Sequence, residues 1–490
     1  MNVLMLGWEF PPFITGGLGT ACYGLTRALD QHGVRITFML PRAVDATHAA
    51  HVTLLGPQSA AADTKRTPSP GRRGRPAPHA VDDPAAVPAM KTASIPASTP
   101  AFAHTKFLTV PTRIVHPYAG AAGDRPVAMP SPRSALRSTL ESTLESTPTT
   151  PPPAPATRTA GPRADPPSAA AGSTPAVDDA GYGHDLMGEV ERYAAFCLDA
   201  AADLDFDVIH AHDWLTYPAG LWIARHTGRP LVVHVHSTEF DRSGEQINQT
   251  IYDIERRGMH GAMRVIAVSQ LTRDVVTRRY GVPPGKVDVV YNGVDIDTRS
   301  AGISEIRGRD KIVLYFGRIT FQKGPEYFVR AAKRVLEHIE DVKFVVAGSG
   351  DQARSMIEMA AGMGIGHKVL FTGFLRGDDI RRVFEIADLY VMPSVSEPFG
   401  IAPLEAMGHD VPVLISNTSG VSEVLTHALK VDFWDVDDMA NKIIAVLRHP
   451  PLGQMLRTHG RMEVRQLTWD GAARECEEIY GRVIGEMAVV

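Results

Sequence analysis

The chain has 490 residues, of which 44% are hydrophobic, 21% charged and 7% aromatic, and its formal net charge is −5. This length exceeds what one ordinary core can bury and predicts at least two domains. The near-balanced charge excludes a dedicated nucleic-acid binder, so phosphate would have to be held locally. Three cysteines, Cys22, Cys197 and Cys476, show no paired or metal-ligand spacing, so we expect neither a disulfide framework nor a cysteine-based zinc site.

The sequence contains no candidate integral membrane segment. No apolar run reaches the roughly 20 residues that a membrane helix needs. Residues 1–12 also lack the basic region and the cleavage site of a secretion signal. We therefore expect a cytoplasmic protein.

Short apolar runs alternate with helix-length amphipathic segments, and the series appears twice. In the first half the runs are residues 3–6, 36–40, 207–210, 231–235, 265–268 and 287–290, and in the second half they are 312–316, 344–347, 369–371, 389–392 and 411–415. Runs rich in β-branched residues and separated by helices are typical of parallel sheets buried on both faces. The sequence therefore predicts an α/β fold of two doubly wound, Rossmann-like domains.

The glycine-rich segment after the first predicted strand is a candidate anion site. Gly16, Gly17 and Leu18 stand directly before a helix expected to end near His32. Paired glycines let backbone N–H groups approach an anion, and the helix N-terminus adds a partial positive charge. A turn made only for packing is the alternative. A dinucleotide fingerprint is disfavoured, because the segment before the glycines is longer than the tight turn of that motif.

Two stretches rich in proline, alanine, serine and threonine interrupt the first predicted domain. Residues 58–104 and 121–181 cannot bury enough apolar surface to offset their ordering entropy, so we expect disordered insertions. Residues 106–118, between them, alternate apolar and polar side chains as a strand does.

The domain boundaries follow from a turn and from the last helix. Asn292 and Gly293 mark a turn, and a polar stretch follows. We therefore place the N-terminal domain at residues 1–298 and the C-terminal domain at residues 310–467. The final helix, residues 468–490, has no strand after it, so we expect it to cross back onto the first domain.

Four histidines and an aspartate follow two predicted strands of the first domain. His210, His212 and Asp213 come after one strand, and His234 and His236 come after the next. Metal binding is a competing interpretation of this cluster. We do not expect a metal, on the ground that alternate residues of a strand face opposite ways, so the second pair need not line one site together.

Two cations follow the first predicted strand of the second domain. Arg318 and Lys323 are five residues apart on a strand-to-helix loop. A guanidinium can bind phosphate through two hydrogen bonds, and an ammonium acts as a point charge. Ligands of open parallel sheets bind beyond the carboxyl ends of strands, so this position favours phosphate over the alternative of solvated loop charges.

Two glutamates flank a turn after the strand at residues 389–392. They lie within Ser-Glu-Pro-Phe-Gly-Ile-Ala-Pro-Leu-Glu, residues 396–405, whose central turn is expected to open a helix with free N–H groups. Glu397 precedes this turn and Glu405 lies about one turn into the helix. Carboxylates only accept hydrogen bonds, which suits the hydroxyl donors of a sugar. Capping by Glu397 or a surface salt bridge of Glu405 is the alternative.

Taken together, these segments resemble the GT-B fold nucleotide-sugar glycosyltransferases, specifically family 4 and the related glycogen and starch synthases of family 5. The likeness covers nearly the whole chain except the two proline-rich stretches. Its most specific element is the glutamate pair, Glu397 and Glu405. The Gly-Gly-Leu loop, the His-Asp-Trp at residues 212–214, the Arg and Lys loop and the helix at Trp469 match in the same order. The resemblance implies two Rossmann-like domains that face each other across a cleft.

The resemblance also implies a role for each matched residue. The implied catalytic residues are Arg318, Lys323, Glu397, His236 and Asp213. The two cations would neutralise the diphosphate leaving group, the histidine and aspartate would contact the transferred sugar, and the glutamate would bind its hydroxyls. Glu405 would hold the ribose. The other implied nucleotide-sugar contacts are Gly16, Gly17, Leu18, Phe399, Gly400, Ile401, Gly373 and Leu375.

The implied activity is that of a retaining hexosyltransferase. It would move glucose from ADP- or UDP-glucose to a glycan acceptor, such as a growing α-1,4-glucan. No cofactor and no metal are expected, because preorganised cations stabilise the charge on the leaving phosphate. Such enzymes are described as using front-side attack, so no carboxylate nucleophile is required. Domain closure would exclude water.

One departure leaves the acceptor and donor open. Similar glycogen synthases carry lysine before Thr-Gly-Gly-Leu, whereas Ile14 and Thr15 stand there in this chain. A family 4 transferase that acts on a cell-surface polysaccharide or a lipid acceptor is therefore an alternative. A GT-B nucleotide-sugar epimerase, a phosphorylase and a catalytically silent scaffold are alternatives from other classes. The base of the donor and the oligomeric state stay open.

Overall fold

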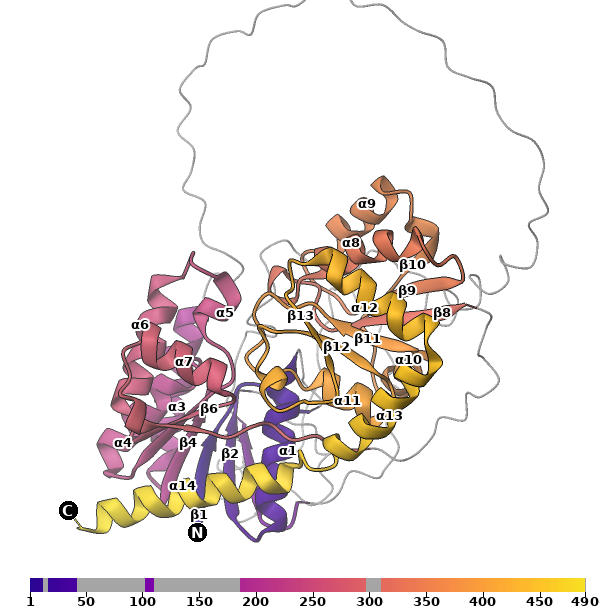
Figure 1. Cartoon of the computed structure of the whole chain (residues 1–490). Coiled ribbons are helices and arrows are strands. Elements are labelled where there is room, and N and C mark those ends of the chain that lie inside the picture. Colours follow the sequence, from indigo (N-terminus) through magenta and orange to yellow (C-terminus); the bar gives the residue numbers. More distant parts are fainter. Residues whose placement is uncertain (12–15, 42–101, 110–185, 297–309, 490) are drawn as a thin grey trace, which may run out of the picture. The chain divides into compact units, whose positions relative to one another are not determined.

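The computed structural model describes residues 1–11, 16–41, 102–109, 186–296 and 310–489 (Figure 1). The expected insertions at 58–104 and 121–181 lie outside these residues, except for 102–104. The described elements all belong to one compact unit, formed by Met1–His116 and Asp185–Val490. Within the described ranges, no helix has the length and apolar character that crossing a membrane requires.

The first sheet is parallel and is formed by the first half of the chain. Among the described residues it has seven strands in the order β3-β2-β1-β4-β5-β6-β7. The strands are β1 (Asn2–Leu6), β2 (Arg35–Leu40), β3 (Thr105–Thr109), β4 (Val208–His212), β5 (Leu231–Val235), β6 (Arg264–Ala267) and β7 (Val287–Val289). The chain runs outward from β1 to β3 and then returns to pair β4 with the other side of β1. The winding direction therefore reverses between β1 and β4, where such sheets bind ligands.

The second sheet repeats this plan. In the part of the chain that the structure describes, it has six parallel strands in the order β10-β9-β8-β11-β12-β13. The strands are β8 (Lys311–Phe316), β9 (Val342–Ala347), β10 (Val369–Gly373), β11 (Leu389–Met392), β12 (Val413–Ser416) and β13 (Leu429–Val431). Here the winding reverses between β8 and β11, which pair directly.

Helices connect most strands of both sheets, as expected for parallel pairs, and three described helices follow the last strand. Those of the first half are α1 (Gly17–Gln31), α3 (Leu186–Ala201), α4 (Tyr217–Thr227), α5 (Glu239–Ser243), α6 (Gln249–Gly261), α7 (Gln270–Arg279) and the 3₁₀ turn η2 (Pro284–Lys286). Those of the second half are η3 (Phe321–Lys323), α8 (Pro325–Leu336), α9 (Ala353–Gly362), η4 (Gly366–Lys368), α10 (Asp378–Ile386), α11 (Ala402–Gly408), η5 (Gly420–Glu423), α12 (Val436–Arg448), α13 (Pro450–Val464) and α14 (Trp469–Val489).

The last helix, α14, packs against α1 and the core of the first sheet (Figure 1). Trp469 and Tyr480 are buried there. A Cβ on Gly24 of α1 would lie 2.2 Å from the Trp469 ring, so only glycine permits this close approach. The Val294 N–H donates to the Leu467 carbonyl at 3.0 Å, so the two connections between the sheets run side by side.

Besides small shifts in the bounds of other strands, three differences separate the described fold from the sequence expectation. Strand β4 extends to His212, because alanine and histidine side chains are buried within the sheet there as readily as the preceding valine and isoleucine. Strand β13 was not predicted, because it is three residues long and contains Lys430. Residues 102–104 belong to the fold: the Ala103 and His104 N–H groups each donate to the Asp30 carboxylate at 2.7 Å.

Candidate active site

The cation loop and the first glutamate of the paired motif meet at the reversal point of the second sheet. Arg318 and Lys323 lie on the loop after β8, and Glu397 lies on the loop after β11. Because β8 and β11 are parallel neighbours, their carboxyl ends open at the same edge. Residues more than seventy positions apart in sequence are thereby brought together.

Lys323 and Glu397 form an ion pair at this edge. The Glu397 side chain is buried, and its carboxylate also accepts a hydrogen bond from Ser394 Oγ at 3.3 Å. The Gln322 carbonyl accepts the Val395 N–H at 2.9 Å, which ties the two loops together. The ion pair is therefore supported by a backbone hydrogen bond between the two loops, and one of its partners is buried.

Arg318 lies beside the glycine-rich segment of the first half. A Cβ on Gly16 would be 3.8 Å from Arg318 Nε. The Arg318 carbonyl accepts the Tyr315 hydroxyl at 2.8 Å. The pKa of Tyr315 is raised chiefly by burial and further by the charge of Glu397, while Arg318 opposes the rise. The guanidinium, the carboxylate and the glycine segment thus share one neighbourhood.

The turn after Glu397 has the shape that a helix start requires. Gly400 has a φ of +102°, which favours glycine. Ile401 is the N-cap of α11, and the Phe399 carbonyl accepts the Val421 N–H at 2.7 Å. Glu405, in the first turn of α11, is half-buried, and burial raises the pKa of its carboxyl to about 7.

Two further predicted contacts lie at and after the end of β10. Gly373 ends the strand with a φ of +73°, and its carbonyl accepts the Gly348 N–H at 2.9 Å. Leu375 is buried in the core of the second sheet. A ligand at this strand end could therefore contact the backbone near Gly373 or the ring of Phe374, which is 48% exposed, but not the buried side chain of Leu375.

Asp213 organises the corresponding reversal point of the first sheet. It follows β4 with a φ of +56°, a conformation that non-glycine residues adopt rarely. Its Oδ1 accepts the N–H groups of His236 and Ser237, at 2.7 and 3.3 Å. Burial raises the pKa of this carboxyl to about 7, while the His236 N–H is the largest influence that lowers it. Asp213 therefore fixes the backbone that carries His236.

The four histidines form one stacked group, which contradicts the expectation that alternate residues of a strand face opposite ways. The ring centroids of His210 and His212 are 4.3 Å apart, and those of His234 and His236 are 4.1 Å apart. That expectation was wrong because residues two positions apart in an extended chain share a face. Burial lowers the pKa values of His210 and His236 to about 3, so these rings are neutral near pH 7.

The glycine segment lies where the first strand leads into α1. Gly16 is the N-cap in an extended conformation, and Gly17 opens the helix. Leu18 is partly buried against the first core. Residues 14 and 15, where the sequence departs from the glycogen synthase pattern, lie outside the described residues.

Hydrogen bonds that the sequence did not reveal join the two halves of the chain near these loops. Ser396 Oγ donates to Asp241 Oδ1 at 2.6 Å, and Ser269 Oγ donates to the Pro398 carbonyl at 2.6 Å. Both contacts flank Glu397. Serines in loops carry no sequence signal that distinguishes them from ordinary polar residues, so only the coordinates reveal them.

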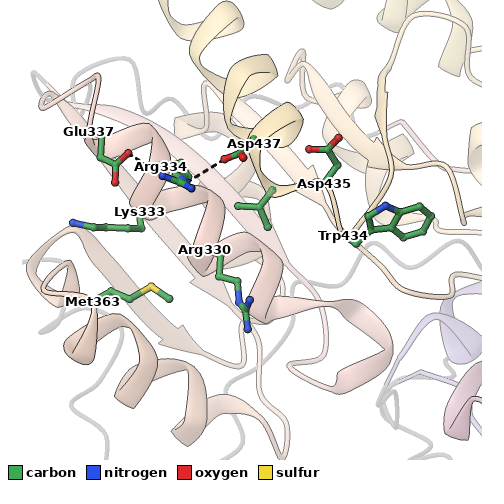
Figure 2. A pocket seen from close by; sticks show the side chains of 9 residues that line it. Arg330, Lys333, Arg334, Glu337, Met363, Trp434, Asp435 and Asp437 are labelled. Atoms are coloured by element: carbon green, nitrogen blue, oxygen red, sulfur yellow. Dashed lines mark ion pairs between the residues drawn. The ribbon is translucent and has the colours of Figure 1, made fainter.

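A separate hollow of about 580 Å³ lies on the helical side of the second sheet (Figure 2). None of the predicted site residues lines it. Its walls are Arg330, Lys333, Arg334, Glu337, Met363, Trp434, Asp435, Val436 and Asp437. Arg334 is paired with Asp437 across it at 3.1 Å. It is distinct from the two reversal points.

Comparison with known proteins gives three family matches. The model for Glycosyl transferases group 1 matches residues 297–462, the one for Glycosyltransferase Family 4 matches 164–298, and the Starch synthase catalytic domain matches 2–68. An uncharacterized glycosyltransferase of Methanocaldococcus jannaschii is 33% identical over 297 residues, which cover 56% of this chain and 75% of that protein. A D-inositol 3-phosphate glycosyltransferase of a Mycobacterium species is 30% identical over 294 residues, which cover 55% of this chain and 66% of that protein.

The fold has relatives among solved structures. Sucrose-phosphate synthase from Thermosynechococcus elongatus superposes with a TM-score of 0.64 at 17% identity, over 99% of each chain. The fold is GT-B, and the chain belongs to the glycosyltransferases. The family and the fold class expected from the sequence are thereby confirmed.

Proposed function

We propose that this glycosyltransferase moves glucose from a nucleoside diphosphate sugar, ADP- or UDP-glucose, to a hydroxyl group of a glycan, with retention of configuration and without a metal. The observation that carries the proposal is the pairing of Lys323 with Glu397 at the reversal point of the second sheet. This is where a doubly wound sheet binds a nucleotide.

The charges at this edge suit a diphosphate and a sugar placed side by side. Arg318 and Lys323 offer a guanidinium and an ammonium to the phosphate oxygens. The negative charge that develops on the leaving phosphate would be stabilised by these cations, which are in place before the reaction starts. Glu397, held against Lys323, would then accept hydrogen bonds from the hydroxyls of the transferred sugar.

The ribose and the hexose of the donor are assigned to residues that can hydrogen-bond to hydroxyl groups. The half-buried carboxyl of Glu405 would accept hydrogen bonds from the ribose hydroxyls, and burial raises its pKa to about 7. In the first half, the neutral imidazole of His236 would contact the hexose, with Asp213 fixing its backbone. The leaving phosphate would take the proton of the acceptor hydroxyl, so no side chain need act as the nucleophile.

The acceptor is proposed as a glycan. The match of residues 2–68 to the Starch synthase catalytic domain supports an α-glucan. The likeness to a D-inositol 3-phosphate glycosyltransferase supports a smaller acceptor instead. Acceptor trials should therefore include glycogen, maltooligosaccharides and inositol 3-phosphate.

The test is a donor and acceptor screen of the full chain in the presence of EDTA. Each of ADP-, UDP- and GDP-glucose is incubated with each acceptor, and both nucleoside diphosphate release and the sugar products are measured. We expect glucosyl transfer with retained configuration, dependent on Lys323 and unaffected by EDTA. An epimerised nucleotide sugar, an inverted product, or activity that needs added metal would contradict the proposal.

A further inference from the structure

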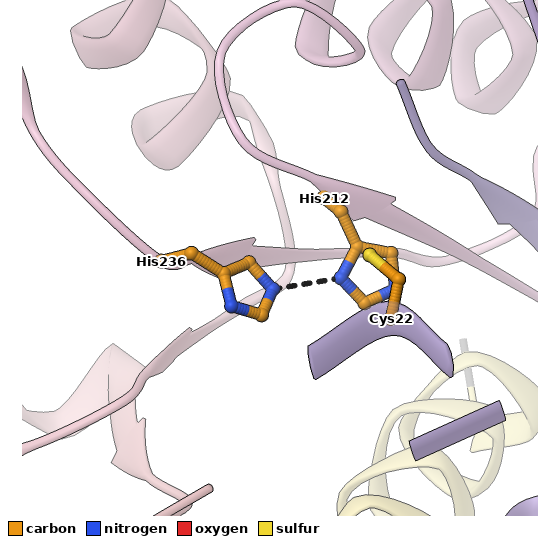
Figure 3. A group of neighbouring side chains, drawn as sticks. All are labelled: Cys22, His212 and His236. Carbon is orange, nitrogen blue, oxygen red and sulfur yellow. Dashed lines mark hydrogen bonds between the residues drawn. The ribbon is translucent and has the colours of Figure 1, made fainter. Parts of the chain in front are cut away.

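A thiol and two imidazoles lie close together at the reversal point of the first sheet. Cys22 of α1, His212 at the end of β4 and His236 after β5 converge there (Figure 3). One ligand atom from each side chain lies within 4.8 Å of the others. Cys22 and His212 are fully buried, whereas His236 is partly exposed, so of the three side chains it is His236 that solvent reaches.

We propose that Cys22, His212 and His236 form a binding site for a thiophilic divalent cation of the zinc type. One thiolate and two imidazoles are the ligands that zinc prefers over magnesium or calcium. Three protein ligands leave the fourth tetrahedral position open, as in zinc sites that exchange a ligand.

The spacing of the two imidazoles fits this ion. His212 Nδ1 and His236 Nε2 are 2.9 Å apart. Two nitrogens bound to one tetrahedral zinc at 2.0–2.1 Å would be about 3.3 Å apart, so the rings need to separate by only a few tenths of an ångström. His212 Nε2 is also buried without a hydrogen-bond partner among the described residues, so the fold leaves part of this ring's polar capacity unused.

The protonation states are also compatible with an ion. Burial lowers the pKa of both imidazoles, so they are neutral and have a lone pair to donate near pH 7. Burial raises the pKa of the Cys22 thiol, and the charges of Asp213 and Glu9 raise it further. The same carboxylates would favour a cation. Binding would form a sulfur–metal bond and release the thiol proton to solvent.

The consequence for activity rests on the proposed function. His236 cannot hold an ion and present the same nitrogen to a hexose, so metal and donor would compete. Zinc would then be an inhibitor of the transferase and not a cofactor for it. The deeper histidines offer a contrast: His210 is fully buried, and its two nitrogens face the Tyr480 hydroxyl and His234 at 2.5 and 3.2 Å.

The metal site is tested on the full chain without any sugar. Protein stripped with EDTA and dialysed is titrated with Co²⁺, whose bond to a thiolate gives a charge-transfer band in the near ultraviolet. We expect one Co²⁺ per chain with this band, displaced by Zn²⁺. Cys22→Ala should abolish the band and weaken Co²⁺ binding at least tenfold. The matched control is Cys476→Ala, which removes another fully buried free cysteine and should leave the band unchanged.

The outcomes separate this inference from the proposed function. Absence of the band in the parent chain at millimolar Co²⁺, or its persistence in a Cys22→Ala chain that melts like the parent, would overturn the site. Cys22→Ser, which nearly preserves the side-chain volume, replaces Cys22→Ala if that variant fails to fold. In the active enzyme, Zn²⁺ should raise the apparent KM for the donor. Zinc binding with an unchanged KM would overturn the competition, whereas an inactive chain would still report on the metal through Co²⁺.

Discussion

The two points at which the sheets reverse their winding carry different kinds of polar side chain. At the first, between β1 and β4, the polar side chains are imidazoles that burial keeps neutral, beside an aspartate whose carboxyl oxygen holds backbone N–H groups. At the second, between β8 and β11, the side chains are charged and paired, as Lys323 and Glu397 show. Two sheets of the same winding can therefore differ in charge. We call the four histidines at the first reversal point the neutral wall, and Arg318, Lys323 and Glu397 at the second the charged wall.

This difference indicates which part of a nucleotide sugar each sheet suits. A hexose is uncharged and is recognised through directional hydrogen bonds, which neutral rings and backbone groups supply. A diphosphate is recognised through charge, which Arg318 and Lys323 would supply in the proposed function. His236 is unsuited to the phosphate role, because its pKa of about 3 leaves it without a positive charge near pH 7. The following predictions separate the two walls.

The largest effect is expected from removing the paired cation. Lys323→Ala should lower turnover by about 100- to 1000-fold, because one preorganised charge on the leaving group is lost. Steady-state kinetics with the active donor measures it. Lys333→Ala, on α8 in the wall of the separate hollow, is the control and should stay within about twofold. Near-normal turnover of Lys323→Ala would contradict the proposal that this edge of the second sheet binds the donor phosphates.

A large effect is also expected at Glu397. Glu397→Gln keeps the size of the side chain but removes the charge that Lys323 faces and an acceptor for sugar hydroxyls, so kcat should fall roughly 100-fold. The same change at the exposed Glu358, which pairs with Arg354 along one helix, is the matched control. Equal kinetics of the two variants would mean that the pair is structural.

A smaller and more selective effect is expected at His236. His236→Ala should lower kcat/KM for the nucleotide sugar about tenfold or more, because a hydrogen bond to the hexose is lost. The affinity for the free nucleoside diphosphate should not change. Calorimetric titration with the diphosphate beside kinetics with the sugar donor separates the two. A loss of diphosphate affinity would show that the first sheet also binds the phosphates.

The neutral wall predicts sensitivity to acid. A buried histidine whose folded-state pKa lies below its unfolded value of about 6.5 binds a proton on unfolding, so stability falls as the pH drops below about 6.5. Asp213 has the opposite sign: its raised pKa of about 7 adds stability as the pH falls from 7 toward 4. His234→Gln removes one lowered histidine.

Melting temperatures at pH 7.5 and 5.5 measure this effect. The parent chain should lose more stability between the two values than His234→Gln, by up to about 1.4 kcal/mol per pH unit for one group. An equal or larger loss in the variant would show that this histidine is charged in the folded state.

The smallest effect is expected from the proline-rich stretch. Deleting residues 58–100 should leave kcat within a few-fold, because their composition cannot supply a packed core. The deletion stops short of residues 102–104, whose backbone binds Asp30. A second variant that lacks residues 58–104 is the comparison. It should melt at a lower temperature than the variant that lacks residues 58–100, because the hydrogen bonds to Asp30 are lost.

The sequence allowed the prediction of the general plan because that plan rests on patterns of long range. Apolar runs such as residues 312–316 and 344–347 appear as β8 and β9 with at most a few residues of difference in their bounds. Ligand positions at strand ends follow from winding alone, so Arg318 and Glu397 could each be named as candidate binding residues before their geometry was known. Strand β13 lacks such a signal because it is three residues long and its central residue is a lysine.

What the sequence could not supply is packing between distant segments. The convergence of Cys22 with His212 and His236 depends on how α1 lies against β4 and β5, and no spacing along the chain encodes it. The stacking of the four imidazoles was missed through a misapplied periodicity, because residues two apart in a strand share a face. Loop serines such as Ser396 gave no signal at all.

The most direct test of the account is the affinity of ADP and UDP for the parent chain, Arg318→Ala and Lys323→Ala, measured by calorimetry with EDTA present. The account predicts binding by the parent chain and a loss of at least about tenfold in each variant, because each removes a charge from the diphosphate. Parent-like affinity in both variants would contradict the claim that the edge between β8 and β11 binds the donor.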